Sequence, residues 1–107
     1  MALHSVLLDD EVILSIDGAF DVVLAPGYLR AVEAAFAADA RRMVVDLALT
    51  TAVDAVAAAA LTETVAACAS RGTHLVLAMP AGVEAEVTDP AQIKPLLNGF
   101  EPWQDAG

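Results

Sequence analysis

Hydrophobic and polar positions follow two different periods along this chain, and each change of period marks the boundary of an expected element. Short apolar runs typical of β-strands cover residues 3–8, 12–16, 43–47 and 75–79. Between them, apolar residues recur at helical spacing over 28–38 and 55–70. Only Asp9-Asp10-Glu11 separates the first two strands, which predicts a hairpin. Strands that alternate with helices indicate an α/β domain.

Residues that terminate helices and strands support these boundaries. Asp17-Gly18 is expected to end the second strand, and Pro26 suits the first turn of the helix that follows. Arg71-Gly72 predicts the end of the second, Ala-rich helix. We therefore expect a mixed β-sheet of about four to five strands, with the helices packed mainly on one face.

The segment 81–107 is less regular, because prolines interrupt it repeatedly. Residues 91–97 predict a short helix that Asn98-Gly99 is suited to cap, and 100–103 predict a terminal strand or an anchoring segment. The 107 residues contain no evident internal repeat. A chain of this length is expected to form one domain over 1–107.

Composition adds a constraint on the core. The chain is 58% hydrophobic but only 5% aromatic. Its core must therefore consist mainly of Ala, Val and Leu, and elements with such small side chains are expected to pack closely.

Charge and cysteine content restrict the partners and the compartment. The chain carries 15 acidic and 5 basic residues, a formal net charge of -10. A negative net charge disfavours binding to nucleic acids and to anionic membrane surfaces. No apolar run approaches the roughly 20 residues that cross a bilayer, so direct membrane insertion is not expected. Without a secretion-type N-terminus and with Cys68 as the single cysteine, a cytoplasmic location is expected.

The sequence offers little catalytic chemistry. His4 and His74 are far apart and have no Cys or Asp at ligand spacing, so no metal site is expected. Cys68 fits a small apolar residue of the Ala-rich helix. There is no glycine-rich phosphate loop and no serine-centred nucleophile motif. We therefore expect neither a cofactor nor a catalytic residue, and predict that the protein is not an enzyme.

One acid stands out because it precedes a run of small apolar residues. Asp54 lies at the start of the Ala-rich helix, where its side chain can accept hydrogen bonds from free N–H groups and its charge complements the helix dipole. A helix cap alone would explain this residue, and it contributes about 0.5–2 kcal/mol to stability.

Three features together resemble the STAS domain, the fold of bacterial anti-sigma factor antagonists. They are the order of elements, the segment Gly18-Ala19-Phe20-Asp21 after the second strand, and Met43-Val44-Val45-Asp46-Leu47 followed by Asp54 at a helix start. The resemblance is strongest over residues 3–80. It implies a domain whose function is to bind another protein.

The resemblance also implies a switch motif, from which this chain departs. STAS domains of this kind carry Asp-Ser-Ser-Gly before the second helix, and a partner kinase phosphorylates a serine there. The matching residues here are Asp54-Ala55-Val56-Ala57, so the acid is retained while Ala55 and Val56 replace both serines. Neither side chain has a hydroxyl that could accept phosphate.

Three nearby polar residues have two interpretations each. The resemblance places Asp21 near the switch loop on the partner-facing surface, whereas a loop residue of this type also turns the chain after a strand. Thr50 or Thr51 could act as a displaced phosphorylation site, but threonines at strand ends more often hydrogen-bond to the backbone.

The resemblance leads to one expected function and two alternatives. We expect a module that binds an anti-sigma factor or another regulatory protein of ATPase fold, without the serine switch, through Asp21, Thr50, Thr51, Asp54, Ala55, Val56 and Ala57. The first alternative is a STAS subunit of a larger assembly, such as a phospholipid transport ATPase complex or a stress-sensing scaffold. The second is a small enzyme or ligand-binding domain with a polar pocket. A homodimer is compatible with each reading.

Overall fold

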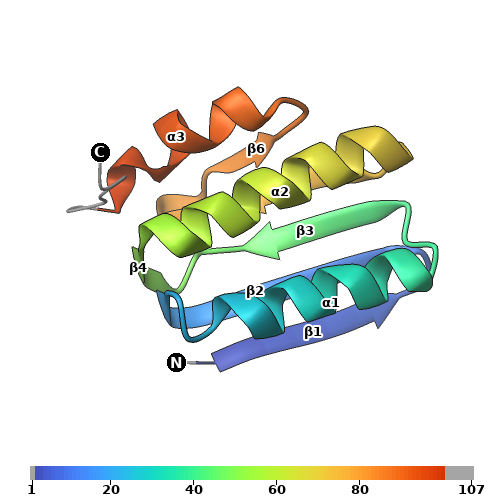
Figure 1. Cartoon of the computed structure of the whole chain (residues 1–107), viewed down its shortest axis with the longest axis horizontal. Helices are drawn as coiled ribbons and strands as arrows, with labels where there is room; N and C mark the ends of the chain where they lie inside the picture. Colours follow the sequence, from blue (N-terminus) through green and yellow to red (C-terminus); the bar gives the residue numbers. More distant parts are fainter. Residues whose placement is uncertain (1, 101–107) are drawn as a thin grey trace.

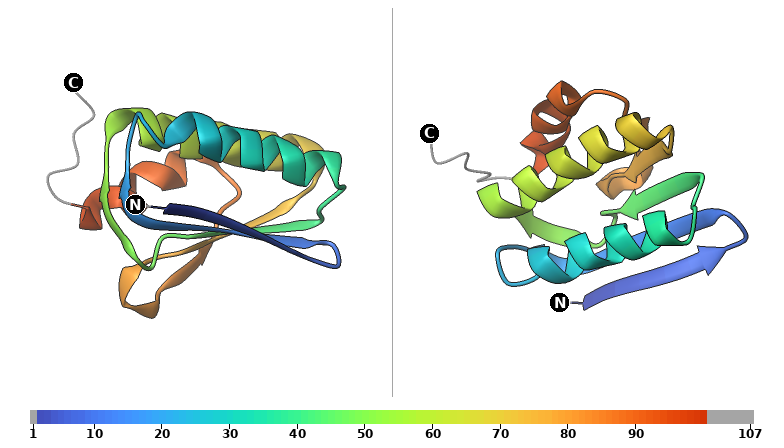
Figure 2. Two further views of the ribbon diagram at one scale, coloured as in Figure 1. Left: turned by 90° about the horizontal axis from the view of Figure 1, so that it is seen from below. Right: turned by 45° about the vertical axis from the view of Figure 1, so that its right-hand side comes forward.

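A computed structural model describes residues 2–100 and has a six-stranded sheet with helices packed against it (Figure 1). The strands are β1 (Ala2–Leu8), β2 (Glu11–Phe20), β3 (Arg42–Asp46), β4 (Thr50–Val53), β5 (His74–Ala78) and β6 (Glu84–Glu86). The helices are α1 (Ala25–Ala37), α2 (Ala55–Arg71) and the short α3 (Ile93–Leu96). Helices α1 and α2 lie on the same face of the sheet (Figure 2).

The sheet has the order β1-β2-β3-β5-β6, and β4 pairs with the end of β2. Strands β2, β3 and β5 are parallel, while β1 and β6 run antiparallel to their neighbours at the two edges. The predicted α/β fold with a mixed sheet is thereby confirmed. Strands β4 and β6 lie where the sequence predicted none, because β4 has only four residues and β6 reads Glu-Ala-Glu.

Strand β2 is longer than the sequence predicted. Asp17-Gly18 does not end the strand, because Gly18 has a φ of 93° and the pairing shifts there from β3 to β4. Glycine adopts this conformation without steric cost, so the strand passes through a bulge and continues. Its last residue, Phe20, is fully buried.

The core fills the space between the sheet and the two long helices. The sheet contributes alternate residues of β2, β3 and β5, and the largest fully buried ones are Phe20, Leu14, Ile16, Met43, Val45, Leu75 and Leu77. Helix α2 contributes small side chains, including Ala57 and Ala60, as the composition predicted. Cys68 is buried on the same helix, and burial raises the pKa of its thiol to about 11.

A buried polar contact joins α1 to α2. Tyr28 Oη lies 2.7 Å from Thr64 Oγ1, which itself donates to the Ala60 carbonyl at 2.8 Å. Because the single threonine proton serves Ala60, the tyrosine hydroxyl is the donor in the contact between the two side chains. Desolvation by burial raises the pKa of Tyr28 far above its usual value.

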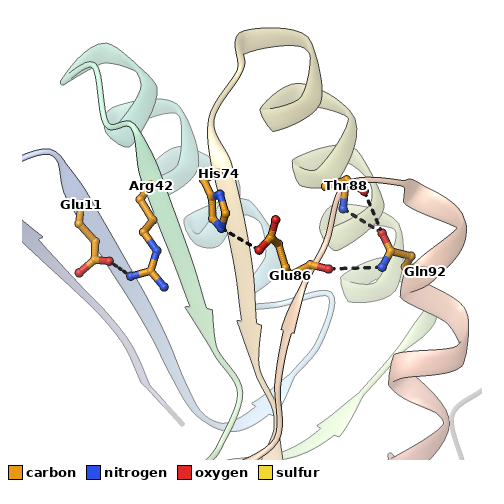
Figure 3. A network of polar contacts seen from close by, with 6 residues as sticks. All are labelled: Glu11, Arg42, His74, Glu86, Thr88 and Gln92. Atoms are coloured by element: carbon orange, nitrogen blue, oxygen red, sulfur yellow. Dashed lines mark hydrogen bonds and ion pairs between the residues drawn. The ribbon is translucent and has the colours of Figure 1, made fainter.

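The sheet face opposite α1 and α2 carries a polar network at the ends of its strands (Figure 3). Arg42 pairs with Glu11, and His74 Nε2 lies 3.3 Å from Glu86 Oε2. Gln92 Nε2 extends the network by donating to the Glu86 carbonyl at 3.3 Å. These contacts link β2 to β3 and β5 to β6, and they connect β6 to the C-terminal turns.

The C-terminal segment forms a series of short helical turns beside α2. The predicted helix over 91–97 corresponds to α3 flanked by turns at Pro90–Gln92 and Leu97–Gly99. Phe100 is buried, while residues 101–103 of the predicted terminal segment lie outside the described residues. Within 2–100, none of the helices combines the length and the apolar character that a membrane span requires.

Candidate functional site

Asp54 connects two parts of the molecule at the start of α2. Its Oδ1 accepts a hydrogen bond from the Ala57 N–H at 2.8 Å, which is the cap that the sequence predicted. Its Oδ2 accepts a second bond from the Val22 N–H at 2.9 Å. The Asp54 N–H also donates to the Phe20 carbonyl at 3.2 Å. Asp54 therefore fixes the loop after β2 against the first turn of α2.

Asp21 shapes that loop from within. Its Oδ1 accepts hydrogen bonds from the Val23 N–H at 3.1 Å and the Leu24 N–H at 3.2 Å. Its carbonyl accepts from the Ala25 N–H at 2.9 Å. These contacts turn the chain from β2 into α1, as one of the two interpretations of Asp21 requires, and a partner-facing role for its side chain stays a prediction.

The two threonines before Asp54 have different environments. The Thr50 side chain is buried, and its Oγ1 donates to the Ile16 carbonyl at 2.7 Å. Thr51 is exposed in the middle of β4. Thr50 therefore behaves as a strand residue bonded to backbone, and only Thr51 offers an accessible hydroxyl.

The positions that match the serine motif present apolar side chains. Val56 is 47% exposed, Ala55 is partly buried, and Ala57 is fully buried on the inner side of α2. Of these three, Val56 projects furthest toward solvent. The surface at this position is therefore hydrophobic and uncharged.

The structure adds three residues that the sequence did not single out as site residues. Val22, Val23 and Leu49 are 56%, 72% and 68% exposed, and together with Val56 we call them the end patch. Asp54 binds the Val22 N–H, and the Leu49 carbonyl accepts from the Gly18 N–H at 3.0 Å, so these segments meet at one end of the molecule (Figure 1). An apolar pair such as Val22-Val23 outside any predicted element was the available sequence signal.

The end patch and the Asp54 contacts together form a surface suited to binding another protein. Both carboxylate oxygens of Asp54 accept backbone hydrogen bonds. Among residues 2–100, no group of three or more His, Cys, Asp or Glu side chains is placed to hold a metal ion. Exposed apolar side chains gathered on a hydrogen-bonded frame favour contact with another protein.

Comparison with known proteins gives a consistent picture of the fold. The family model described as the STAS domain matches residues 5–106. The unphosphorylated anti-sigma factor antagonist SpoIIAA has a similar structure, with a TM-score of 0.68, 13% identity, and coverage of 95% of this chain and 86% of that one. An anti-sigma factor antagonist from Mycobacterium paratuberculosis matches with a TM-score of 0.64, 22% identity, and coverage of 98% and 88%.

A third structural match involves a much longer protein. The crystal structure of Mglu matches with a TM-score of 0.65 and 21% identity over 75% of this chain, which spans only 20% of the length of that chain. No curated protein sequence matches the chain. At these identities the structural matches establish the shared fold.

Proposed function

Since this chain belongs to the STAS domain family, we propose that it is a cytoplasmic regulatory module that binds an anti-sigma factor of kinase-like ATPase fold. When this protein binds the anti-sigma factor, the sigma factor that the anti-sigma factor holds is released. The observation that carries the proposal is the end patch, which presents four exposed apolar side chains at the Asp54-braced end of the molecule.

The proposed contact lacks the serine switch. Ala55 and Val56 have no hydroxyl, and the Thr50 hydroxyl is buried in a hydrogen bond. A phosphate cannot be added at the two motif positions, so it cannot repel the partner there. Binding is then constitutive and depends on how much of the protein is present.

A pair of matched variants tests the use of the end patch. Val56→Asp places a carboxylate in the proposed contact, while Val83→Asp makes the same change at a valine that is 55% exposed outside the patch. Tagged wild-type protein and both variants are used as bait in lysate of the source organism, with and without Mg-ATP. Partners and bait are then identified by mass spectrometry.

The expected partner is a kinase-fold anti-sigma factor that the wild type and Val83→Asp recover under both conditions. Val56→Asp should recover at least about tenfold less of this partner, because an unpaired carboxylate would be buried in an apolar contact. Equal recovery by Val56→Asp would contradict the proposed surface. Phosphate on Thr51 after incubation with Mg-ATP would contradict the unswitched mechanism.

Recovery of other proteins would point to the alternative function. A transporter ATPase or a scaffold protein that co-purifies in fixed ratio would identify the chain as a subunit of a larger assembly. Failure to recover any partner would argue against an interaction module.

A further inference from the structure

Residues 2–100 leave an apolar pocket at the carboxyl end of β5. The pocket has a volume of about 280 Å³ and lies between the loop that joins β5 to β6 and the C-terminal turns. Its apolar lining consists of Met79, Pro80, Val83, Pro95, Leu96 and Phe100. Among the described residues, no charged side chain lines it. The pocket is therefore suited to an uncharged, apolar group.

The lining has a buried floor and an exposed wall. Met79 and Phe100 are buried, whereas Val83 is 55% exposed and Pro95 is exposed as well. A group that fills the pocket covers this wall and removes its apolar surface from water. Sites that enclose drug-sized molecules have volumes of about 300–1,000 Å³, so this smaller pocket fits a single large side chain better than a whole ligand.

The described part of the chain ends at this pocket. Phe100, its last residue, belongs to the lining, and residues 101–107 follow with the sequence Glu-Pro-Trp-Gln-Asp-Ala-Gly. Trp103 is the only large apolar residue in that segment and the only tryptophan of the chain. Three residues span at most about 11 Å, so the backbone of Trp103 cannot be farther than this from Phe100.

We propose that the pocket takes the indole side chain of Trp103. The indole covers Val83 and Leu96, and it thereby joins the β5–β6 loop to the C-terminal turns. Because the lining offers no side-chain oxygen or nitrogen as an acceptor, the indole N–H faces water at the mouth of the pocket.

Covalent attachment favours Trp103 over a side chain of another protein. A group tethered three residues from the lining has an effective concentration on the order of mM. Pro102 restricts the backbone between Phe100 and Trp103, which lowers the conformational entropy that docking removes. A side chain from another molecule has neither advantage. This contact agrees with the anchoring segment that the sequence predicts over 100–103.

The pocket and the end patch can be tested separately. No residue of the end patch lines the pocket. Val83→Asp, the control for partner binding, places a carboxylate in the wall of the pocket, and Val56→Asp makes the same change outside it. Each variant is therefore the matched control of the other, and failure of one proposal leaves the other standing.

The fluorescence of the single tryptophan reports this contact without a label. Acrylamide quenching and the emission wavelength are measured for the wild type, Val83→Asp and Val56→Asp, with the peptide Glu-Pro-Trp-Gln as the exposed reference. Circular dichroism checks that each variant is folded. A dilution series from about 100 to 1 μM tests whether a second copy is involved. Nuclear Overhauser effects then identify the methyl groups next to the indole.

The wild type should be quenched at least about threefold less than the peptide and should emit at shorter wavelength, because its indole is shielded from water. Val83→Asp should approach the peptide in both measurements, because docking would desolvate the new carboxylate. Val56→Asp should match the wild type. Nuclear Overhauser effects should connect the indole protons to the methyl groups of Val83 and Leu96.

Three results would overturn the proposal. Wild-type quenching equal to that of the peptide would show that Trp103 does not enter the pocket. Shielding that Val83→Asp leaves unchanged, without nuclear Overhauser effects to Val83 or Leu96, would place the indole elsewhere. Shielding that is lost on dilution would show that Trp103 contacts another molecule.

Discussion

At the scale of single residues, Asp54 performs two structural tasks with its two carboxylate oxygens. One oxygen caps α2 through Ala57, and the other binds the Val22 N–H, 32 residues earlier in the chain. A simple cap would leave the loop after β2 free to move. The double contact gives the end patch a defined shape, because Val22 and Val56 are both held close to Asp54.

The contribution of the Asp54 hydrogen bonds to the stability of the protein can be measured with variants. Asp54→Ala removes both hydrogen bonds and should lower the free energy of unfolding by about 2 kcal/mol, while Asp54→Asn keeps one acceptor oxygen and should lose about half as much. Urea denaturation measures these values. Glu33→Ala, at an exposed acid of α1, is the control and should change stability by less than about 0.5 kcal/mol. An Asp54→Ala variant as stable as this control would contradict the bridging role.

The sequence predicted one of these two tasks. Helix capping depends only on residues close together in the sequence, so the position of Asp54 before an Ala-rich run was sufficient to predict the cap of α2. The bond to Val22 depends on the closure of β2 against β4, which no local pattern contains. Leu49 and Val23 were missed for the same reason, because the exposure of a loop side chain is decided by the fold around it.

At the scale of elements, the contact between α1 and α2 includes one buried hydroxyl pair. Tyr28 donates to Thr64, and Thr64 donates to the α2 backbone at Ala60. The ring of Tyr28 also packs against Phe20 of β2, with centroids 4.9 Å apart. Tyr28 thus positions α1 relative to both α2 and the sheet.

A double-mutant cycle tests this link. Thr64→Val leaves the buried Tyr28 hydroxyl without an acceptor and should cost about 1–3 kcal/mol of unfolding free energy. Tyr28→Phe leaves Thr64 bonded to Ala60 and should cost about 1 kcal/mol. The double variant should cost less than the sum, because no buried donor is then unsatisfied. Strict additivity in denaturant unfolding would show that the two hydroxyls do not interact.

The sequence predicted elements that have a strong pattern of their own. The strands at β1, β3 and β5 and both long helices follow from apolar periodicity. Strand β6 was missed because Glu84 and Glu86 give it no apolar pattern, and it exists through its pairing with β5. Asp89 and Gln92 form a capping box at the turn before α3, and this spacing was visible in the sequence but not used.

At the scale of the whole molecule, the buried thiol of Cys68 and the buried hydroxyl of Tyr28 make the protein less stable at alkaline pH. Burial raises the pKa of Cys68 from 9.0 to about 11 and raises the pKa of Tyr28 further above its ordinary value of 10.0. The unfolded chain therefore releases both protons at lower pH than the folded chain does. Above about pH 9 the folded state holds more protons, so the free energy of unfolding falls as pH rises.

Unfolding measured across alkaline pH tests this predicted decrease in the free energy of unfolding. The free energy of unfolding should change little with these two groups below about pH 9 and then fall, with each group contributing up to about 1.4 kcal/mol per pH unit. Tyr28 is the only tyrosine, so ultraviolet absorbance of tyrosinate should rise together with unfolding. Tyr28→Phe should weaken the dependence above about pH 10. The same slope in both proteins would show that Tyr28 does not contribute.

The bulge at Gly18 has a consequence for how the chain can change in length. Strand β2 pairs with β3 over Glu11–Ser15 and with β4 from Gly18 to Phe20, and it ends at the loop held by Asp54. One residue inserted before Gly18 would exchange the two faces of the following strand and move Phe20 out of the core. The same insertion in an exposed turn is absorbed locally. Evolution can therefore vary the composition of β2 more freely than its number of residues.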